Sequence, residues 1–159
     1  MTTDGIHERM LLDKELPAVY RQLVALSRDV SQAAAAAGLE RKLIELVKVR
    51  ASQLNGCAFC LDMHGRAARE AGETERRLLV LAAWRESGLF DERERAALAV
   101  TEAITNVPIA RDVPDEVYAQ ASKALTEPQL AAVGWAATVI NAFNRLGVFS
   151  RWPLPEVAE

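Results

Sequence analysis

Residues 55–64 read Asn-Gly-Cys-Ala-Phe-Cys-Leu-Asp-Met-His and contain both cysteines and one of the two histidines of this 159-residue chain. A helix-prone run follows Gly56, so the C-x-x-C pair is predicted to lie at the start of a helix. Backbone N–H groups and the helix dipole stabilise a thiolate there, and the thiolate is the reactive form of cysteine. On a helix, Cys57, Cys60 and His64 share one face, since they stand at positions i, i+3 and i+7. The stretch is therefore predicted to be a dithiol redox centre.

The rest of the chain is predicted to be helical on both sides of this stretch. Apolar residues recur at helical spacing, and no segment shows the alternation of a strand. We expect helices over about residues 16–37, 40–54, 58–71, 75–86, 92–105, 115–124 and 127–147. The sequence predicts an all-α, single-domain bundle of six or seven helices, with the C-x-x-C pair at the N-terminus of a central helix. We divide it into an N-terminal helix (16–37), a core (39–105), C-terminal helices (114–147) and a tail (148–159).

Capping patterns and tryptophans add detail to this prediction. Asp91 with Glu94, and Thr126 with Gln129, have the spacing of reciprocal N-terminal caps. Prolines make the tail unsuitable for a regular helix. Three tryptophans are interpreted as packing residues: Trp84 and Trp135 in core or interface positions, and Trp152 as an anchor of the tail.

Composition narrows the classes of partner and location. Net charge is −3 with both signs interspersed, so no nucleic-acid partner is expected. No apolar run approaches the roughly 18–20 residues needed to span a bilayer, and the acidic N-terminus does not resemble a secretory signal, so we expect a cytoplasmic protein with no membrane partner. In a reducing compartment, two cysteines three residues apart are typical of catalytic or metal sites. A solvated basic face is expected from four arginines after the cysteines, Arg66, Arg69, Arg76 and Arg77.

The cysteines and His64 are the minimum set for reducing a peroxide. A thiolate attacks the O–O bond, a sulfenic acid forms, and the second thiol closes a disulfide. His64 can supply the proton that the leaving group needs. Glu45 lies twelve residues before Cys57 on the preceding helix, and a hairpin about residues 55–56 would turn its carboxylate toward the cysteines.

These residues resemble a known family. Glu45, eleven residues, and then Cys57-x-x-Cys60-x-x-x-His64 form the active-site signature of the alkylhydroperoxidase D (AhpD-like) family, within the carboxymuconolactone decarboxylase-like superfamily. The flanking segments are also similar, at residues 46–56, 63–64, 67–69, 83–86, 90–98 and 141–146.

The resemblance implies an AhpD-like fold, a homo-oligomer (trimer or hexamer) and weak thiol-dependent peroxidase activity on alkyl hydroperoxides without a cofactor. It implies that Cys60 is the peroxidatic cysteine, that Cys57 is the resolving one, and that Glu45 and His64 form a proton relay. An external dithiol or lipoyl-type adaptor protein is the expected reductant. Some members carry a histidine where this chain has Phe59. The decarboxylase branch lacks the cysteine pair, so lactone decarboxylation is not expected.

Other interpretations of the same residues remain open. The pair can act as a disulfide switch in a non-enzymatic redox sensor or interaction protein. A lyase or isomerase would use Glu45 and His64 without the cysteines. The cysteines can also be buried core thiols, or part of a zinc site, which needs a fourth ligand that only His7 offers. We expect no metal.

Overall fold

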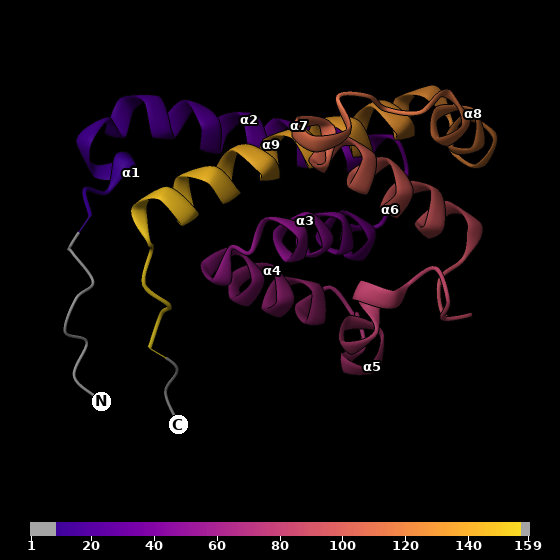
Figure 1. Ribbon diagram of the computed structural model, residues 1–159, viewed down its shortest axis with the longest axis horizontal. Coiled ribbons are helices and arrows are strands. Elements are labelled where there is room, and N and C mark those ends of the chain that lie inside the picture. Colours follow the sequence, from indigo (N-terminus) through magenta and orange to yellow (C-terminus); the bar gives the residue numbers. More distant parts are fainter. Residues whose placement is uncertain (1–8, 157–159) are drawn as a thin grey trace.

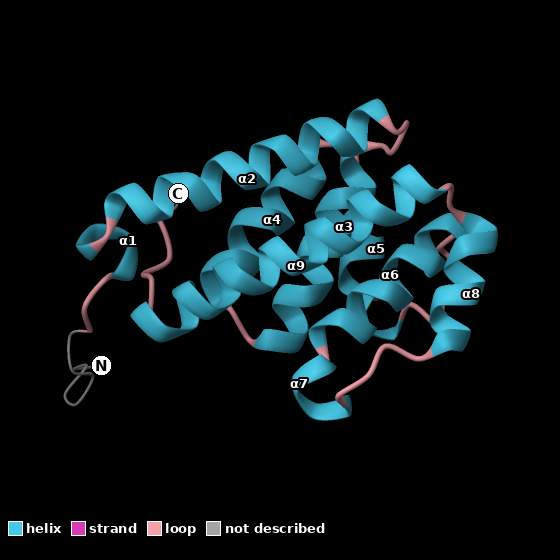
Figure 2. Cartoon of the chain, turned by 90° about the horizontal axis from the view of Figure 1, so that it is seen from above, coloured by secondary structure: helices cyan, strands magenta, loops and turns pink. Residues whose placement is uncertain are grey.

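The structure is a computed structural model that describes residues 9–156 of the chain. Within that range it contains nine α-helices, one short 3-10 helix and no strand. The helices are α1 (Leu12–Glu15), α2 (Pro17–Ala36), α3 (Arg41–Asn55), α4 (Ala58–Glu70), α5 (Glu75–Leu79), the 3-10 helix (Leu81–Ala83), α6 (Glu92–Thr105), α7 (Val107–Ala110), α8 (Asp115–Ala124) and α9 (Glu127–Ser150). They form one bundle (Figures 1 and 2), which confirms the all-α prediction. The expected number of six or seven was too low, partly because α1 and α7 are single turns of four residues each.

The ends of the long helices follow local sequence signals. The Asp91 side chain accepts a hydrogen bond from the Glu94 N–H at 2.9 Å, and the Glu94 carboxylate accepts one from the Asp91 N–H at 2.9 Å. Thr126 and Gln129 form the same capping box at the start of α9. Gly56 ends α3 in the left-handed region at φ 66°, a conformation that glycine adopts without steric cost. Both capping boxes and this break are confirmed.

The helix expected over residues 75–86 is wrong as a single element. It stops at Leu79, and the chain tightens into the 3-10 helix before bending at Trp84. Leu81 and Trp84 are both buried against α3 and α6, and the Trp84 indole donates to the Glu102 carboxylate at 2.8 Å. Tertiary packing of these two side chains therefore overrides the local helical preference.

Helix α3 lies in the middle of the bundle, with α2 and α9 on one side and α4 on the other (Figures 1 and 2). Its apolar residues point to both sides: some join a cluster with α2, α6, α8 and α9, and others join a cluster with the 3-10 helix and α6. Each fully buried side chain of this kind contributes roughly 1.5–3 kcal/mol of transfer free energy. The helix that carries Glu45 is thus fixed from several directions. Its buried apolar residues are Leu43, Ile44, Leu46, Val47, Val49 and Ala51.

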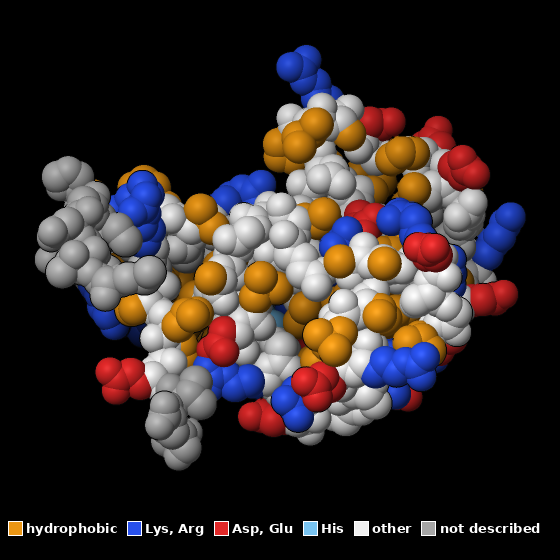
Figure 3. Space-filling model, turned by 60° about the horizontal axis from the view of Figure 1, so that its bottom comes forward, with side chains coloured by type: hydrophobic (Ala, Val, Ile, Leu, Met, Phe, Trp, Pro, Cys, Tyr) orange, Lys and Arg blue, Asp and Glu red, His pale blue; other side chains and the backbone are white. Residues whose placement is uncertain are grey.

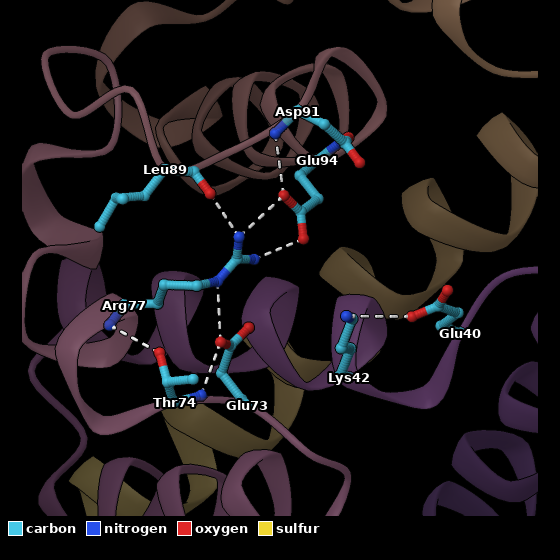
Figure 4. A network of polar contacts seen from close by, with 8 residues as sticks. All are labelled: Glu40, Lys42, Glu73, Thr74, Arg77, Leu89, Asp91 and Glu94. Carbon is cyan, nitrogen blue, oxygen red and sulfur yellow. Dashed lines mark hydrogen bonds and ion pairs between the residues drawn. The ribbon is translucent and has the colours of Figure 1, made fainter.

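Arg77 ties the segment after α4 to the start of α6 (Figure 4). Its guanidinium donates to the Glu73 carboxylate at 2.8 Å, and also to the Glu94 carboxylate and the Leu89 carbonyl. Glu94 is the same residue that completes the cap of α6. The interpretation of Arg77 as part of a solvated basic face was wrong, because its charge is neutralised inside this network.

The surface is mixed rather than dominated by one kind of side chain. Acidic and basic groups alternate over the face in Figure 3, with apolar side chains between them. Trp84 is buried, whereas Trp135 is 55 % exposed and fills no core position in this chain. Among residues 9–156, no helix is both long and apolar enough to cross a membrane.

Candidate active site

The two cysteines form a disulfide at the N-terminus of α4, where the sequence placed them. Cys57 is the N-cap residue, its Cα lies 5.3 Å from that of Cys60, and its sulfur accepts a hydrogen bond from the Cys60 N–H at 3.3 Å. Both residues are only 1 % exposed. The left-handed Gly56 sets the angle between α3 and α4, so the start of α4 folds back along α3.

Glu45 and His64 meet across these two helices. The His64 Nδ1 lies 2.8 Å from Glu45 Oε2, and the Lys48 ammonium donates to Glu45 Oε1 at 3.0 Å. Burial of the Glu45 carboxylate raises its pKa, but the hydrogen bond from His64 and the charge of Lys48 outweigh that effect and lower the pKa below its ordinary value. The carboxylate is therefore ionised near neutral pH and accepts from both partners.

Cys60 and His64 open onto a cavity of about 440 Å³ between α2, α4 and α9, which we name the Cys60 cavity. Its volume lies within the range of roughly 300–1,000 Å³ that is typical of ligand pockets. Four aromatic rings contribute to the wall, and the polar groups gather near Cys60 and along α2. The lining residues are Tyr20, Val24, Ser27, Arg28, Val30, Ser31, Lys48, Phe59, Cys60, Met63, His64, Ala136, Val139, Ile140, Phe143 and Trp152.

Trp152 packs against the site from the C-terminal tail. Its indole N–H donates to Asp13 at 2.8 Å, and its ring makes edge-to-face contacts with Phe59 and Tyr20, at centroid distances of 5.2 and 6.1 Å. The prediction that Trp152 anchors the tail is confirmed. Its place beside the cysteines was not predicted, because no local pattern relates residue 152 to residue 59.

A buried amide network holds the turn that precedes Cys57. The Asn55 amide donates to the side-chain oxygens of Asn141 and Asn144, both at 2.9 Å. Asn144 in turn donates to the Ser52 hydroxyl at 2.9 Å, and the Ser52 carbonyl accepts from the Cys57 N–H at 3.1 Å. This chain of hydrogen bonds connects α9 to the backbone of Cys57, so α9 helps to place the disulfide.

Gly147 brings α9 against the disulfide itself. A Cβ at this position would lie 2.9 Å from the Cys57 sulfur and 3.1 Å from the Trp152 ring. Only glycine allows this approach without displacing a neighbour.

The sequence identified four residues of this constellation, and the structure brings Glu45, Cys57, Cys60 and His64 together. Lys48 was missed as a member, although it lies one helical turn after Glu45 on α3 and pairs with it. Residues 9–156 contain no cluster of three potential metal ligands. His7, the fourth ligand that a zinc site would need, lies outside the described residues.

A sequence profile of the Carboxymuconolactone decarboxylase family matches residues 17–103, which is more than half of the chain. The chain belongs to this family. The uncharacterized protein YdfG of Bacillus subtilis (strain 168) is 43 % identical over 110 residues, covering 69 % of this chain and 74 % of that protein. The uncharacterized protein YnjA of Escherichia coli (strain K12) is 38 % identical over 63 residues, which are 40 % of this chain and 35 % of YnjA.

Two solved structures share the fold. ATU0492 of Agrobacterium tumefaciens, a protein of unknown function named as a candidate AhpD antioxidant defence protein, is 31 % identical with a TM-score of 0.83, covering 94 % of this chain and 99 % of that one. The apo debrominase Bmp8 has a TM-score of 0.67 and 16 % identity, and the match covers 95 % of this chain and 93 % of that one. The first of these supports the AhpD-like branch, and the second shows the fold alone.

Proposed function

We propose that this protein is a thiol-dependent, peroxidase-like oxidoreductase that reduces alkyl hydroperoxides through Cys57 and Cys60. The observation that carries the proposal is a disulfide-bonded cysteine pair whose second member lines the same apolar cavity as the Glu45-bound His64. A cavity of about 440 Å³ has room for a substrate much larger than hydrogen peroxide, since one water occupies roughly 30 Å³ of liquid.

The reaction has three balanced steps. The Cys60 thiolate attacks the O–O bond, an S–O bond forms, and the alkoxide leaves as an alcohol with a proton from His64. The Cys57 thiol then attacks the sulfenic sulfur of Cys60, an S–S bond forms, and hydroxide leaves as water. An external dithiol, free or on a lipoyl-type adaptor protein, returns two electrons and reopens the disulfide.

Glu45 and His64 act as the proton relay in this scheme. Ionised Glu45 accepts from Nδ1–H, so the other ring nitrogen, Nε2, is free to exchange a proton on the side of the cavity. Lys48 holds the second carboxylate oxygen and fixes its orientation. We further propose a cytoplasmic homo-oligomer, a trimer or hexamer, that uses neither nucleic acid nor membrane.

Turnover of an organic hydroperoxide with a dithiol reductant tests the role of the cysteines. We expect Cys60→Ser to lose turnover, and Cys57→Ser to stall as a sulfenic acid that a dimedone probe labels. Full activity of Cys60→Ser would overturn the assignment. Negligible turnover with every dithiol, together with an oligomeric state that follows the disulfide, would instead favour the redox-sensing alternative.

The relay is tested by Glu45→Gln, which keeps the size of the side chain and removes its charge. We expect turnover to fall by about 10²–10⁴-fold, the range of general acid–base catalysis. Glu40→Gln is the matched control, because Glu40 is exposed and, within residues 9–156, forms an ion pair only with the half-buried Lys42. Equal activity of the two variants would refute the relay.

A further inference from the structure

The two cysteines of the disulfide line different cavities. Cys60 lines the Cys60 cavity described above, and Cys57 does not. Cys57 lines a second cavity of about 330 Å³, which we name the Cys57 cavity, and Cys60 does not line that one. Phe59 and Trp152 line both cavities, and their rings meet edge to face with centroids 5.2 Å apart. An aromatic wall thus divides the approach to one sulfur from the approach to the other.

The cavity from which a reductant attacks determines which cysteine is released in thiol–disulfide exchange. A thiolate attacks a disulfide sulfur along the line of the S–S bond, from the side away from the sulfur that leaves, and the more acidic thiol leaves faster. Attack through the Cys57 cavity would release the Cys60 thiolate toward the Cys60 cavity, which Lys48 also lines and where its positive charge can stabilise a thiolate. Attack on Cys60 would require the reductant to occupy the cavity that the hydroperoxide uses.

We infer that the Cys57 cavity is the docking site of the reductant, and that the reductant is a slender, negatively charged dithiol. This inference rests on the proposed function. Cys57 is 1 % exposed beneath Gly147 and Trp152, so only a narrow chain reaches its sulfur. Among the residues that line this cavity, Arg151 is the only charged one, and it is exposed. An anionic group on the reductant would lie near this guanidinium while the thiol reaches inward.

The exchange is balanced as follows. One thiolate of the reductant bonds to the Cys57 sulfur, and the Cys60 thiolate leaves. The second thiol of the reductant then attacks the reductant sulfur that is bonded to Cys57, so the reductant becomes a cyclic disulfide and the Cys57 thiol is released. Two electrons and two protons pass from the dithiol to the protein.

The test separates the two half-reactions in stopped-flow experiments with the full chain. Oxidised protein is reduced by dihydrolipoate, an anionic dithiol, or by dihydrolipoamide, its neutral counterpart, while prereduced protein is oxidised by cumene hydroperoxide. We expect Arg151→Glu to slow reduction by dihydrolipoate about fivefold, within the range that one exposed ion pair supports, and reduction by dihydrolipoamide by less than twofold. Arg111→Glu is the matched control, because Arg111 is also exposed, also has a positive φ (57° against 50°) and lines neither cavity. It should leave both rates unchanged.

A second variant tests the steric part. Gly147→Ala narrows the approach to Cys57, so both dithiols should reduce this variant at least fivefold more slowly than the wild type. Circular dichroism verifies that the variant folds. If Gly147→Ala does not fold, the Arg151→Glu experiment still tests the inference. In a further experiment, the oxidised protein reacts with a one-thiol analogue of the reductant and the reaction is quenched. Peptide mass mapping should then find the mixed disulfide on Cys57.

The inference is overturned by an adduct on Cys60, or by Arg151→Glu slowing both dithiols equally. Loss of hydroperoxide oxidation in the wild type, with the charge-dependent reduction intact, would reject the proposed function and keep the docking site.

Discussion

Replacing Gly147 with alanine is expected to destabilise the protein relative to a matched substitution in the same helix. The added Cβ would lie 2.9 Å from the Cys57 sulfur and 3.1 Å from the Trp152 ring, closer than side chains normally approach. Gly134 is the control, because it also lies inside α9, and a Cβ there would make only an ordinary contact with Ile104 at 3.9 Å.

The magnitude follows from two opposing effects. Alanine is favoured over glycine inside a helix by about 0.5–1 kcal/mol, and both variants gain this amount. Overpacking a filled site costs about 1–3 kcal/mol, and only Gly147→Ala carries this cost. The free energies of unfolding of the two variants should therefore differ by about 1–3 kcal/mol. For a domain of this size, that difference corresponds to roughly 2–12 °C in Tm.

Thermal unfolding of the oxidised proteins measures this difference, and a Cys57→Ala background identifies its source. Removing the sulfur removes the shortest of these contacts and leaves those with Trp152, so the difference between the two glycine variants should shrink in that background. Equal melting temperatures of Gly134→Ala and Gly147→Ala would refute the close packing of α9 on the disulfide. A difference that Cys57→Ala leaves unchanged would place the clash elsewhere.

Three further perturbations follow from the same site. Because the folded-state pKa of Glu45 is lowered, its contribution to stability is present above about pH 4.5 and is lost as pH falls through the folded pKa. Urea titrations should therefore show that the free energy of unfolding falls less steeply with acid in Glu45→Gln than in the wild type. Identical pH profiles of the two proteins would contradict this. Asn144→Ala leaves the buried Ser52 hydroxyl and the Asn55 amide each with one partner fewer, so we expect a loss of about 2–3 kcal/mol in urea unfolding, whereas a loss under 0.5 kcal/mol would contradict the network. Trp152→Phe keeps an aromatic ring and removes the hydrogen bond to Asp13, so at least about 1 kcal/mol should be lost. A loss of the same size on top of Asp13→Ala, which has no side-chain acceptor, would show that the pair does not interact.

The helix boundaries were predictable where short-range signals determine them. Asp91 with Glu94, and Thr126 with Gln129, are complete caps within four residues, and each begins its helix as expected. The break at Leu79 was not predictable, because it depends on the packing of Trp84 against α6 and on the carboxylate of Glu102, eighteen residues further along. Sequence periodicity carries no information about such a distant partner.

The candidate site likewise contains residues that local sequence signals predicted and residues that they did not. Glu45, Cys57, Cys60 and His64 lie on two consecutive helices joined by the Asn55–Gly56 turn. Helical spacing was enough to predict that Cys57, Cys60 and His64 share one face, whereas Glu45 was added to them by the family signature. Trp152, Gly147 and the asparagines of α9 come from about 80 to 95 residues away in the chain. Trp135, interpreted as a core or interface residue, is exposed, whereas Trp152 in the proline-containing tail reaches the cysteines. Residue type alone did not distinguish the two.

The match to the family profile ends at residue 103, and this boundary separates two parts of the site. Glu45, the cysteines and His64 lie inside the matched region, whereas Gly147, Arg151 and Trp152 lie beyond it. The residues of the proposed redox chemistry therefore lie in the part of the chain that the family profile describes. The shape of both cavities depends in part on α9 and the tail, so in the proposed function these segments influence the choice of hydroperoxide and of reductant. Exchanging residues 147–152 with those of a relative should accordingly change the preference among reductants more than the reactivity of Cys60.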